Sequence, residues 1–123
     1  MPSPTVVIAQ NNPAIALGLA DDLHAHFVRV AIAESAVELP AILARHEARM
    51  AVLDLELVDL EEVNRLARTF SDLAIVCTHR SPDERMWMAA LNAGAVEFCH
   101  PQDVRSILRA WHTGSRRHMA AAA

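Results

Sequence analysis

The sequence is poor in aromatic residues and in cysteine, and it has no long apolar run. Aromatic side chains make up only 4% of the 123 residues, so any core must be built from aliphatic side chains and methionine. Two cysteines, Cys77 and Cys99, are too few for a disulfide framework, and we expect both as reduced thiols. No apolar run approaches the roughly 20 residues that span a bilayer. The N-terminus lacks the basic and apolar regions of a secretion signal, so we expect a cytoplasmic protein without membrane contact.

Charge and length indicate one weakly acidic domain. The formal net charge is −4, and the absence of a Lys/Arg cluster argues against direct nucleic-acid binding by this domain. Hydrophobic residues make up 53% of the chain, which is enough for a sizeable core in a single domain. We place that domain at residues 1–118. Residues 119–123, which end in an alanine run, are a tail or the point where a longer protein was cut.

Five short β-rich runs alternate with longer helical patterns. The first run ends at Asn12-Pro13, where asparagine suits a helix cap and proline the first helical turn. Strict alternation of strand and helix predicts an α/β domain whose parallel sheet is covered on both faces. The expected strands are residues 5–9, 28–33, 50–55, 73–77 and 95–99.

Capping signals also mark the later helices. Ser81-Pro82 predicts the start of the fourth helix, with the proline at the first helical position. Gly94 predicts its end, and Gly114 the end of the last helix. Within the fourth helix we expect Met88 and Leu91 to face the core.

In a parallel sheet, ligands bind beyond the carboxyl ends of the strands. The segments to read for function are therefore residues 10–12, 54–56, 78–79 and 99–101.

Four segments resemble the response-regulator receiver domain of two-component signalling. Residues 50–55 (MAVLDL) resemble the family's third strand, which ends on a phosphoacceptor aspartate, and residues 75–78 (IVCT) resemble the fourth, which ends on Thr or Ser. Residues 92–101 (NAGAVEFCHP) resemble its Gly-Ala, aromatic and Lys-Pro segment, and residues 9–13 (AQNNP) lie where the family has an acidic pair. The resemblance covers nearly the whole chain. It implies a flavodoxin-like (βα)5 fold with the strand order 2-1-3-4-5.

The resemblance assigns a role to each matched residue. It makes Asp54 the candidate phosphoacceptor, Thr78 the hydroxyl that contacts the phosphoryl group, and Phe98 the aromatic switch. His100 replaces the family's lysine, either as a partly charged substitute or as an inert neighbour of Asp54. By the same resemblance the peptide bond before Pro101 is expected to be cis.

The acidic pocket that the resemblance implies is degenerate. Receivers gather carboxylates around Mg²⁺, a hard cation that prefers such oxygens in octahedral geometry. Here Gln10 and Asn11 replace the acidic pair and leave Asp54 as the carboxylate at the matched positions, while Glu56 could restore one charge. We therefore expect no strong metal site and no cofactor beyond weakly bound Mg²⁺.

Simpler interpretations exist for the same residues. Asp54 and Thr78 could merely end strands, Phe98 could be an ordinary core residue, and residues 10–12 match turn and cap chemistry. A flavin-binding protein of the same sheet order needs a phosphate loop rich in Ser, Thr and Gly after the first strand, and residues 10–14 provide none.

Zinc is a further alternative, suggested by Cys77, His79, Cys99 and His100 near adjacent strand ends. Neighbouring residues on a strand point to opposite faces, so these side chains do not easily converge on one ion.

The favoured interpretation is an atypical receiver domain: a signalling and interaction module, not an enzyme, with weakened or absent phosphorylation. The alternative is a functional phosphoacceptor that a histidine kinase phosphorylates on Asp54. Expected partners are a histidine kinase or other signalling protein, an attached output domain, or a second copy of the chain. We expect the contact face on the fourth helix, fifth strand and fifth helix, with Trp87 as its anchor.

Overall fold

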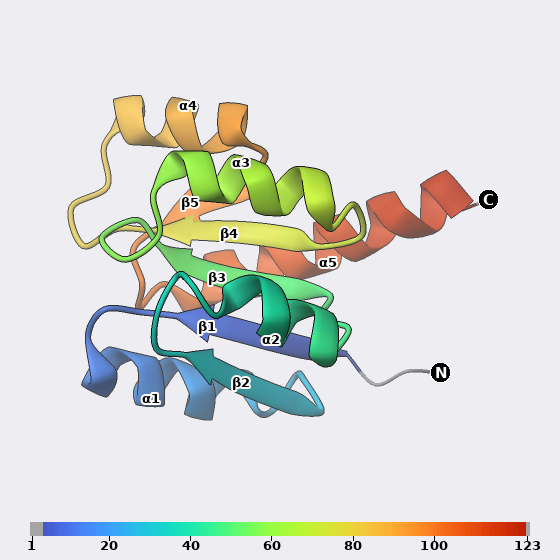
Figure 1. Cartoon of the computed structure of the whole chain (residues 1–123), viewed down its shortest axis with the longest axis horizontal. Helices are drawn as coiled ribbons and strands as arrows, with labels where there is room; N and C mark the ends of the chain where they lie inside the picture. Colours follow the sequence, from blue (N-terminus) through green and yellow to red (C-terminus); the bar gives the residue numbers. More distant parts are fainter. Residues whose placement is uncertain (1–3, 123) are drawn as a thin grey trace.

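A computed structural model describes residues 4–122, with side chains through residue 113. Five strands alternate with five helices along this part of the chain (Figure 1). The strands are β1 (Thr5–Ala9), β2 (Arg29–Ala33), β3 (Met50–Asp54), β4 (Ala74–Thr78) and β5 (Glu97–Cys99). The helices are α1 (Pro13–Leu23), α2 (Leu39–Arg45), α3 (Leu60–Thr69), α4 (Glu84–Ala93) and α5 (Val104–Ala122).

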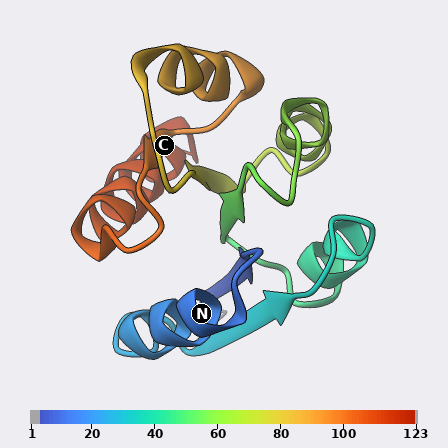
Figure 2. The same cartoon turned by 90° about the vertical axis from the view of Figure 1, so that its left-hand side faces the viewer.

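The strands form one parallel sheet in the order β2-β1-β3-β4-β5, which confirms the predicted α/β architecture and strand order. All strand arrows in Figure 1 point to the same side, and Figure 2 looks at the molecule from that side. Helices α1 and α5 cover one face of the sheet, while α2, α3 and α4 cover the other (Figure 2). None of the helices within residues 4–122 is long and apolar enough to cross a membrane.

Alternating strand side chains supply the two halves of the core. On β1, Val7 packs with the cluster under α2, α3 and α4, while Val6 and Ile8 pack with the cluster under α1 and α5. The second cluster contains an aromatic pair, Phe27 and Trp111, whose ring centroids lie 5.0 Å apart. Because β1, β3 and β4 are buried along their whole length, the polar residues at their carboxyl ends are held by rigid elements.

The start of α1 follows the predicted chemistry, and the start of α4 departs from it. Asn12 caps α1 by accepting hydrogen bonds from the backbone N–H groups of Ala14 and Ile15, at 2.9 and 3.3 Å. Asp103 caps α5 through the Ser106 backbone N–H at 3.1 Å. The predicted start of α4 at Ser81-Pro82 is wrong by two residues. Asp83, rather than Ser81, provides the cap, because its carboxylate accepts the Met86 N–H at 2.8 Å.

Helix ends and faces give one confirmation and two corrections. Gly94 ends α4 as predicted, with a φ of 116° that favours glycine. A Cβ atom at this position would also lie 2.6 Å from the Ala67 Cβ atom. Gly114 does not end α5, which continues to Ala122 because the alanine run beyond it has high helix propensity. Met88 was expected in the core but is 52% exposed, since Ala90 and Ala93 form the buried side of α4.

Candidate functional site

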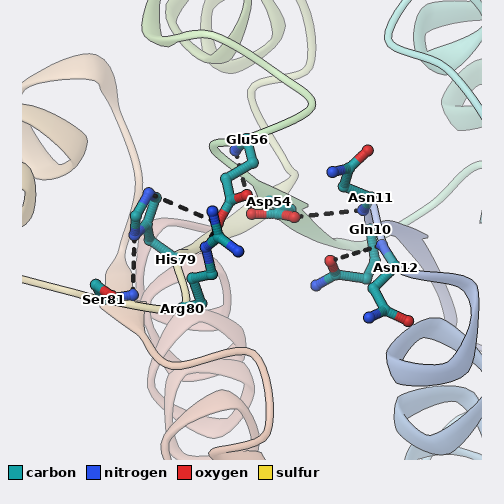
Figure 3. Close-up of polar contacts among 8 residues, drawn as sticks. All are labelled: Gln10, Asn11, Asn12, Asp54, Glu56, His79, Arg80 and Ser81. Carbon is teal, nitrogen blue, oxygen red and sulfur yellow. Dashed lines mark hydrogen bonds and ion pairs between the residues drawn. The ribbon is translucent and has the colours of Figure 1, made fainter.

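Asp54 lies at the centre of the carboxyl edge of the sheet. It is the last residue of β3 and is only 3% exposed. Its carboxylate accepts two backbone hydrogen bonds: Oδ2 from the Asn11 N–H at 3.3 Å and Oδ1 from the Glu56 N–H at 3.2 Å (Figure 3). The loops after β1 and β3 therefore share this one carboxylate.

The side chains of Gln10 and Asn11, which stand at the matched acidic positions, do not bind the Asp54 carboxylate. Gln10 Oε1 accepts the Asn12 N–H at 3.1 Å, so it stabilises the turn into α1. The Asn11 side chain points away from Asp54, and only its backbone nitrogen faces the carboxylate (Figure 3). Within this loop, turn and cap chemistry accounts for the side chains of residues 10 and 12.

Thr78 lies opposite Asp54 on the neighbouring strand. The two residues are in register at the ends of β3 and β4, and paired residues of a parallel sheet project to the same face. Thr78 is fully buried. Its hydroxyl oxygen, Oγ1, has no hydrogen-bond partner within the described part of the chain. A buried, unpaired hydroxyl costs about 1–3 kcal/mol of folding stability. It is free to donate a hydrogen bond to a ligand oxygen.

Glu56 belongs to an ion-pair cluster that the sequence analysis missed. Its Oε1 lies 3.0 Å from Arg80 Nε and 3.8 Å from His79 Nε2 (Figure 3). His79 Nδ1 accepts the Ser81 N–H at 3.0 Å, so the neutral ring carries its proton on Nε2, facing Glu56. The carboxylate of Glu56 is thus already engaged, and the cluster joins the loops that follow β3 and β4.

The strand register contained a signal for this pairing. Asp54 and Thr78 are in register, and Glu56 and Arg80 each lie two residues farther along the chain. An acid and a base at the same offset beyond a paired position are placed to meet across the two loops.

His100 belongs to a turn that differs from the expected one. The expected cis bond before Pro101 is wrong, because there is no cis peptide bond among the described residues. The trans isomer is favoured by about 0.5–1 kcal/mol. A turn then follows in which His100 Nδ1 accepts the Gln102 N–H at 3.1 Å and the His100 carbonyl accepts the Asp103 N–H at 3.0 Å. No hydrogen bond or ion pair joins His100 to Asp54 in the described chain, and the sequence contains no lysine.

Three other residues singled out from the sequence have clear surroundings. Phe98 is buried and packs with the cluster under α2, α3 and α4, as an ordinary core residue would. Trp87 is 42% exposed on α4, which leaves its indole accessible. Pro101 is buried at the start of the turn before α5.

The two cysteines lie apart in the core and behave as structural thiols. Cys77 packs in the cluster under α2, α3 and α4, while Cys99 packs in the cluster under α1 and α5. Burial raises the pKa of both thiols to about 12. A smaller increase comes from the Cys99 thiol for Cys77, and from the Asp103 and Glu97 carboxylates for Cys99. Thiolate, the form that binds zinc, is therefore scarce at neutral pH.

The site does not fit a divalent metal that needs several charged oxygens. Across residues 4–113, whose side chains the structure describes, no three His, Cys, Asp or Glu side chains are grouped so that they could hold a metal ion. The Asp54 oxygens already accept backbone hydrogen bonds, and the Glu56 carboxylate already pairs with Arg80. Mg²⁺ is reluctant to lose its water, so we derive no step through a metal.

Comparisons with known proteins place the fold. RcsB, a response regulator of Salmonella typhimurium, matches with a TM-score of 0.78 and 20% identity, over 93% of this chain and 62% of RcsB. A response regulator from Thermotoga maritima matches with a TM-score of 0.78 and 20% identity, over 91% of this chain and 97% of that chain. The signal receiver domain of an HD domain-containing protein from Pseudomonas fluorescens matches with a TM-score of 0.81 and 16% identity, over 95% and 98% of the two chains.

Sequence comparison adds no relative: no protein-family model and no curated protein matches the chain. At these identities the structural matches establish the fold. The chain has the fold of the receiver domains of response regulators, and it spans less than two thirds of RcsB.

Proposed function

We propose that this chain is an atypical response-regulator receiver domain, a non-enzymatic signalling and interaction module in which phosphorylation of Asp54 is weakened or absent. The composition of the carboxyl-edge site carries the proposal. Asp54 is the carboxylate at the matched positions, and it is in register with Thr78, whose hydroxyl is buried. The residues that would normally charge this pocket are amides at positions 10 and 11 and an imidazole at position 100.

Charge balance supports a site that holds no metal. Several clustered carboxylates repel one another, and a bound divalent ion offsets that repulsion. Asp54 has two backbone donors, and Glu56 has Arg80. Both acids are therefore compensated in the resting protein, and a metal ion would gain little to offset the loss of its hydration shell.

The partners follow from the receiver fold. We infer that the module contacts a histidine kinase or another signalling protein, or transmits a conformational state to an attached output domain. RcsB, which is described as interacting with DNA, is longer than the part that matches this chain. We place the contact face on α4, β5 and α5, because Trp87 and Met88 are both exposed there and Trp is favoured at interfaces.

A functional phosphoacceptor is the second candidate, and the unpartnered Thr78 hydroxyl favours it. A phosphoryl group on Asp54 would carry oxygens that could accept a hydrogen bond from this hydroxyl, which has no partner in the described structure. In that case the negative charge of the group would have to be offset by Arg80, His79 or His100 rather than by a metal.

Intact-mass measurement after incubation with Mg²⁺ and a small phosphodonor tests the proposal. We expect little or no phosphoryl adduct on the unmodified protein, and a substantial adduct on the triple variant Gln10→Asp, Asn11→Asp, His100→Lys. Asp54→Asn in the triple variant is the control and should abolish the adduct. Rapid, stoichiometric labelling of the unmodified protein at Asp54 would instead establish the phosphoacceptor function.

A further inference from the structure

The two edges of the sheet differ in how well they are protected. An edge strand exposes a row of unpaired backbone groups, and proteins usually blunt such edges with short strands, charges, proline or bulges. At one edge, β5 has only three residues and carries Glu97, whose carboxylate accepts the backbone N–H of the next residue, Phe98, at 2.8 Å. This edge has the expected protection.

The β2 edge lacks this protection. Strand β2 pairs with β1 alone, and after Arg29 its sequence is Val-Ala-Ile-Ala, without charge, proline or glycine. Six large hydrophobic side chains of the described part of the chain are exposed, and four of them come from α1, β2 and the residues beside β2. These four are Leu17, Val28, Ile32 and Val37.

We propose that β2 is a self-association edge, at which two copies of this chain pair antiparallel about a twofold axis through Ala31. Directly opposite residues of antiparallel strands share a face. In this register Val30 of one copy lies opposite Ile32 of the other, on the α1 side of the sheet. Two five-stranded sheets would thereby join into one.

The charged residues at the two ends of β2 favour antiparallel over parallel pairing. Arg29 at one end of β2 would lie opposite Ala33 of the second copy, one residue from its Glu34, so each end of the paired strands brings a basic end of one β2 near the acidic end of the other. A parallel pairing would instead place Arg29 beside Arg29. Both side chains are available: Arg29 contacts only the His46 ring, at 3.3 Å, and no ion pair of Glu34 occurs among the described residues.

Apolar contact beside the strand adds to the pairing. Leu17 and Ile32 both line an open groove of about 450 Å³ on the α1 side of the edge. Burial of these exposed side chains against the second copy removes apolar surface from water. Because the paired strands are short, we expect a weak dimer rather than an obligate one.

Sedimentation equilibrium over a wide concentration range tests the pairing and does not depend on the proposed signalling function. The unmodified chain should form a concentration-dependent dimer. Ile32→Lys, Arg29→Glu and Glu34→Arg should each raise the dissociation constant by about tenfold or more. The double charge reversal Arg29→Glu, Glu34→Arg should restore it, because the opposite charges meet again.

Thr69→Lys, at an exposed position on α3, is the matched control, and circular dichroism verifies that each variant is folded. Met88→Lys tests the face on α4 as the competing interface. The proposal predicts no effect of Thr69→Lys on the dimer. A chain that stays monomeric at millimolar concentration would overturn the proposal. So would a dimer that is lost with Met88→Lys but unaffected by Ile32→Lys, or a double charge reversal that fails to restore association.

Discussion

Asp54 and Thr78 lie in register at the ends of β3 and β4, so that a buried carboxylate and a buried, unpartnered hydroxyl lie on neighbouring strands at one edge of the sheet. An unpaired buried hydroxyl is destabilising, whereas a methyl group of the same shape carries no such cost. We therefore expect Thr78→Val to raise the free energy of unfolding of the unphosphorylated protein by about 1 kcal/mol, as measured by urea unfolding. The reciprocal control, Val76→Thr on the same strand, should destabilise it by about 1–3 kcal/mol. Loss of stability in Thr78→Val would mean that the hydroxyl has a partner in solution.

The Glu56–Arg80 pair should matter more for loop mobility than for stability. The Arg80 side chain is 76% exposed, and such pairs contribute below about 1 kcal/mol. Glu56→Gln and Arg80→Ala should therefore change the free energy of unfolding little. Both should accelerate amide hydrogen exchange in the loop after β4, which loses its tie to the loop after β3.

Arg65→Ala is the matched control for that experiment, because Arg65 pairs with Glu62 within α3. It should leave exchange in the loop after β4 unchanged. Equal exchange in all three variants would show that the Glu56–Arg80 pair does not restrain the loops.

The two thiols should be inert in the folded protein. Burial raises the pKa of Cys77 and Cys99 to about 12, so the reactive thiolate is scarce until the pH approaches that value. We expect a thiol-reactive dye at pH 8 to label neither cysteine in native protein and both in guanidinium. Fast labelling of the native protein would contradict the buried placement.

The cap of α5 should make a small, pH-dependent contribution to stability. The side-chain hydrogen bond from Ser106 is the largest cause that lowers the pKa of Asp103, followed by the Ser106 backbone N–H. A carboxylate with a depressed pKa stabilises the fold above its unfolded value of 3.8, and this contribution is lost as the pH falls through the folded value.

Urea unfolding of Asp103→Asn checks this prediction, because asparagine still caps a helix but does not titrate. The stability difference between the two proteins should shrink as the pH falls below about 4. A difference that stays constant from pH 7 to strongly acidic conditions would contradict it.

The architecture could be predicted from local patterns because the residues within each helix and strand are enough to indicate that element. The buried apolar runs, the Asn12 cap and Gly94 each act within a few residues of where they stand. Predictions failed where long-range packing or competing local bonds decide. Met88 lies outside the core because the small residues Ala90 and Ala93 let α4 approach its neighbours, and the bond before Pro101 is trans within a turn closed by local hydrogen bonds.

The candidate site shows the same division. Its members could be predicted because strand ends of a parallel sheet meet at one edge. Their contacts could not, because these depend on loop geometry. Asn11 approaches Asp54 through its backbone rather than its side chain, and Glu56 turns to Arg80, a residue that has no place in the family resemblance.

The central claim is that the pocket has too little negative charge to hold a divalent metal. Titration of the unmodified protein with Mg²⁺, followed by the amide resonances of Asn11 and Glu56, tests it most directly, with Gln10→Asp, Asn11→Asp as the comparison. We predict no saturable binding by the unmodified protein at millimolar Mg²⁺ and clear saturation in the double variant. Tight, saturable binding of Mg²⁺ by the unmodified protein would contradict the account.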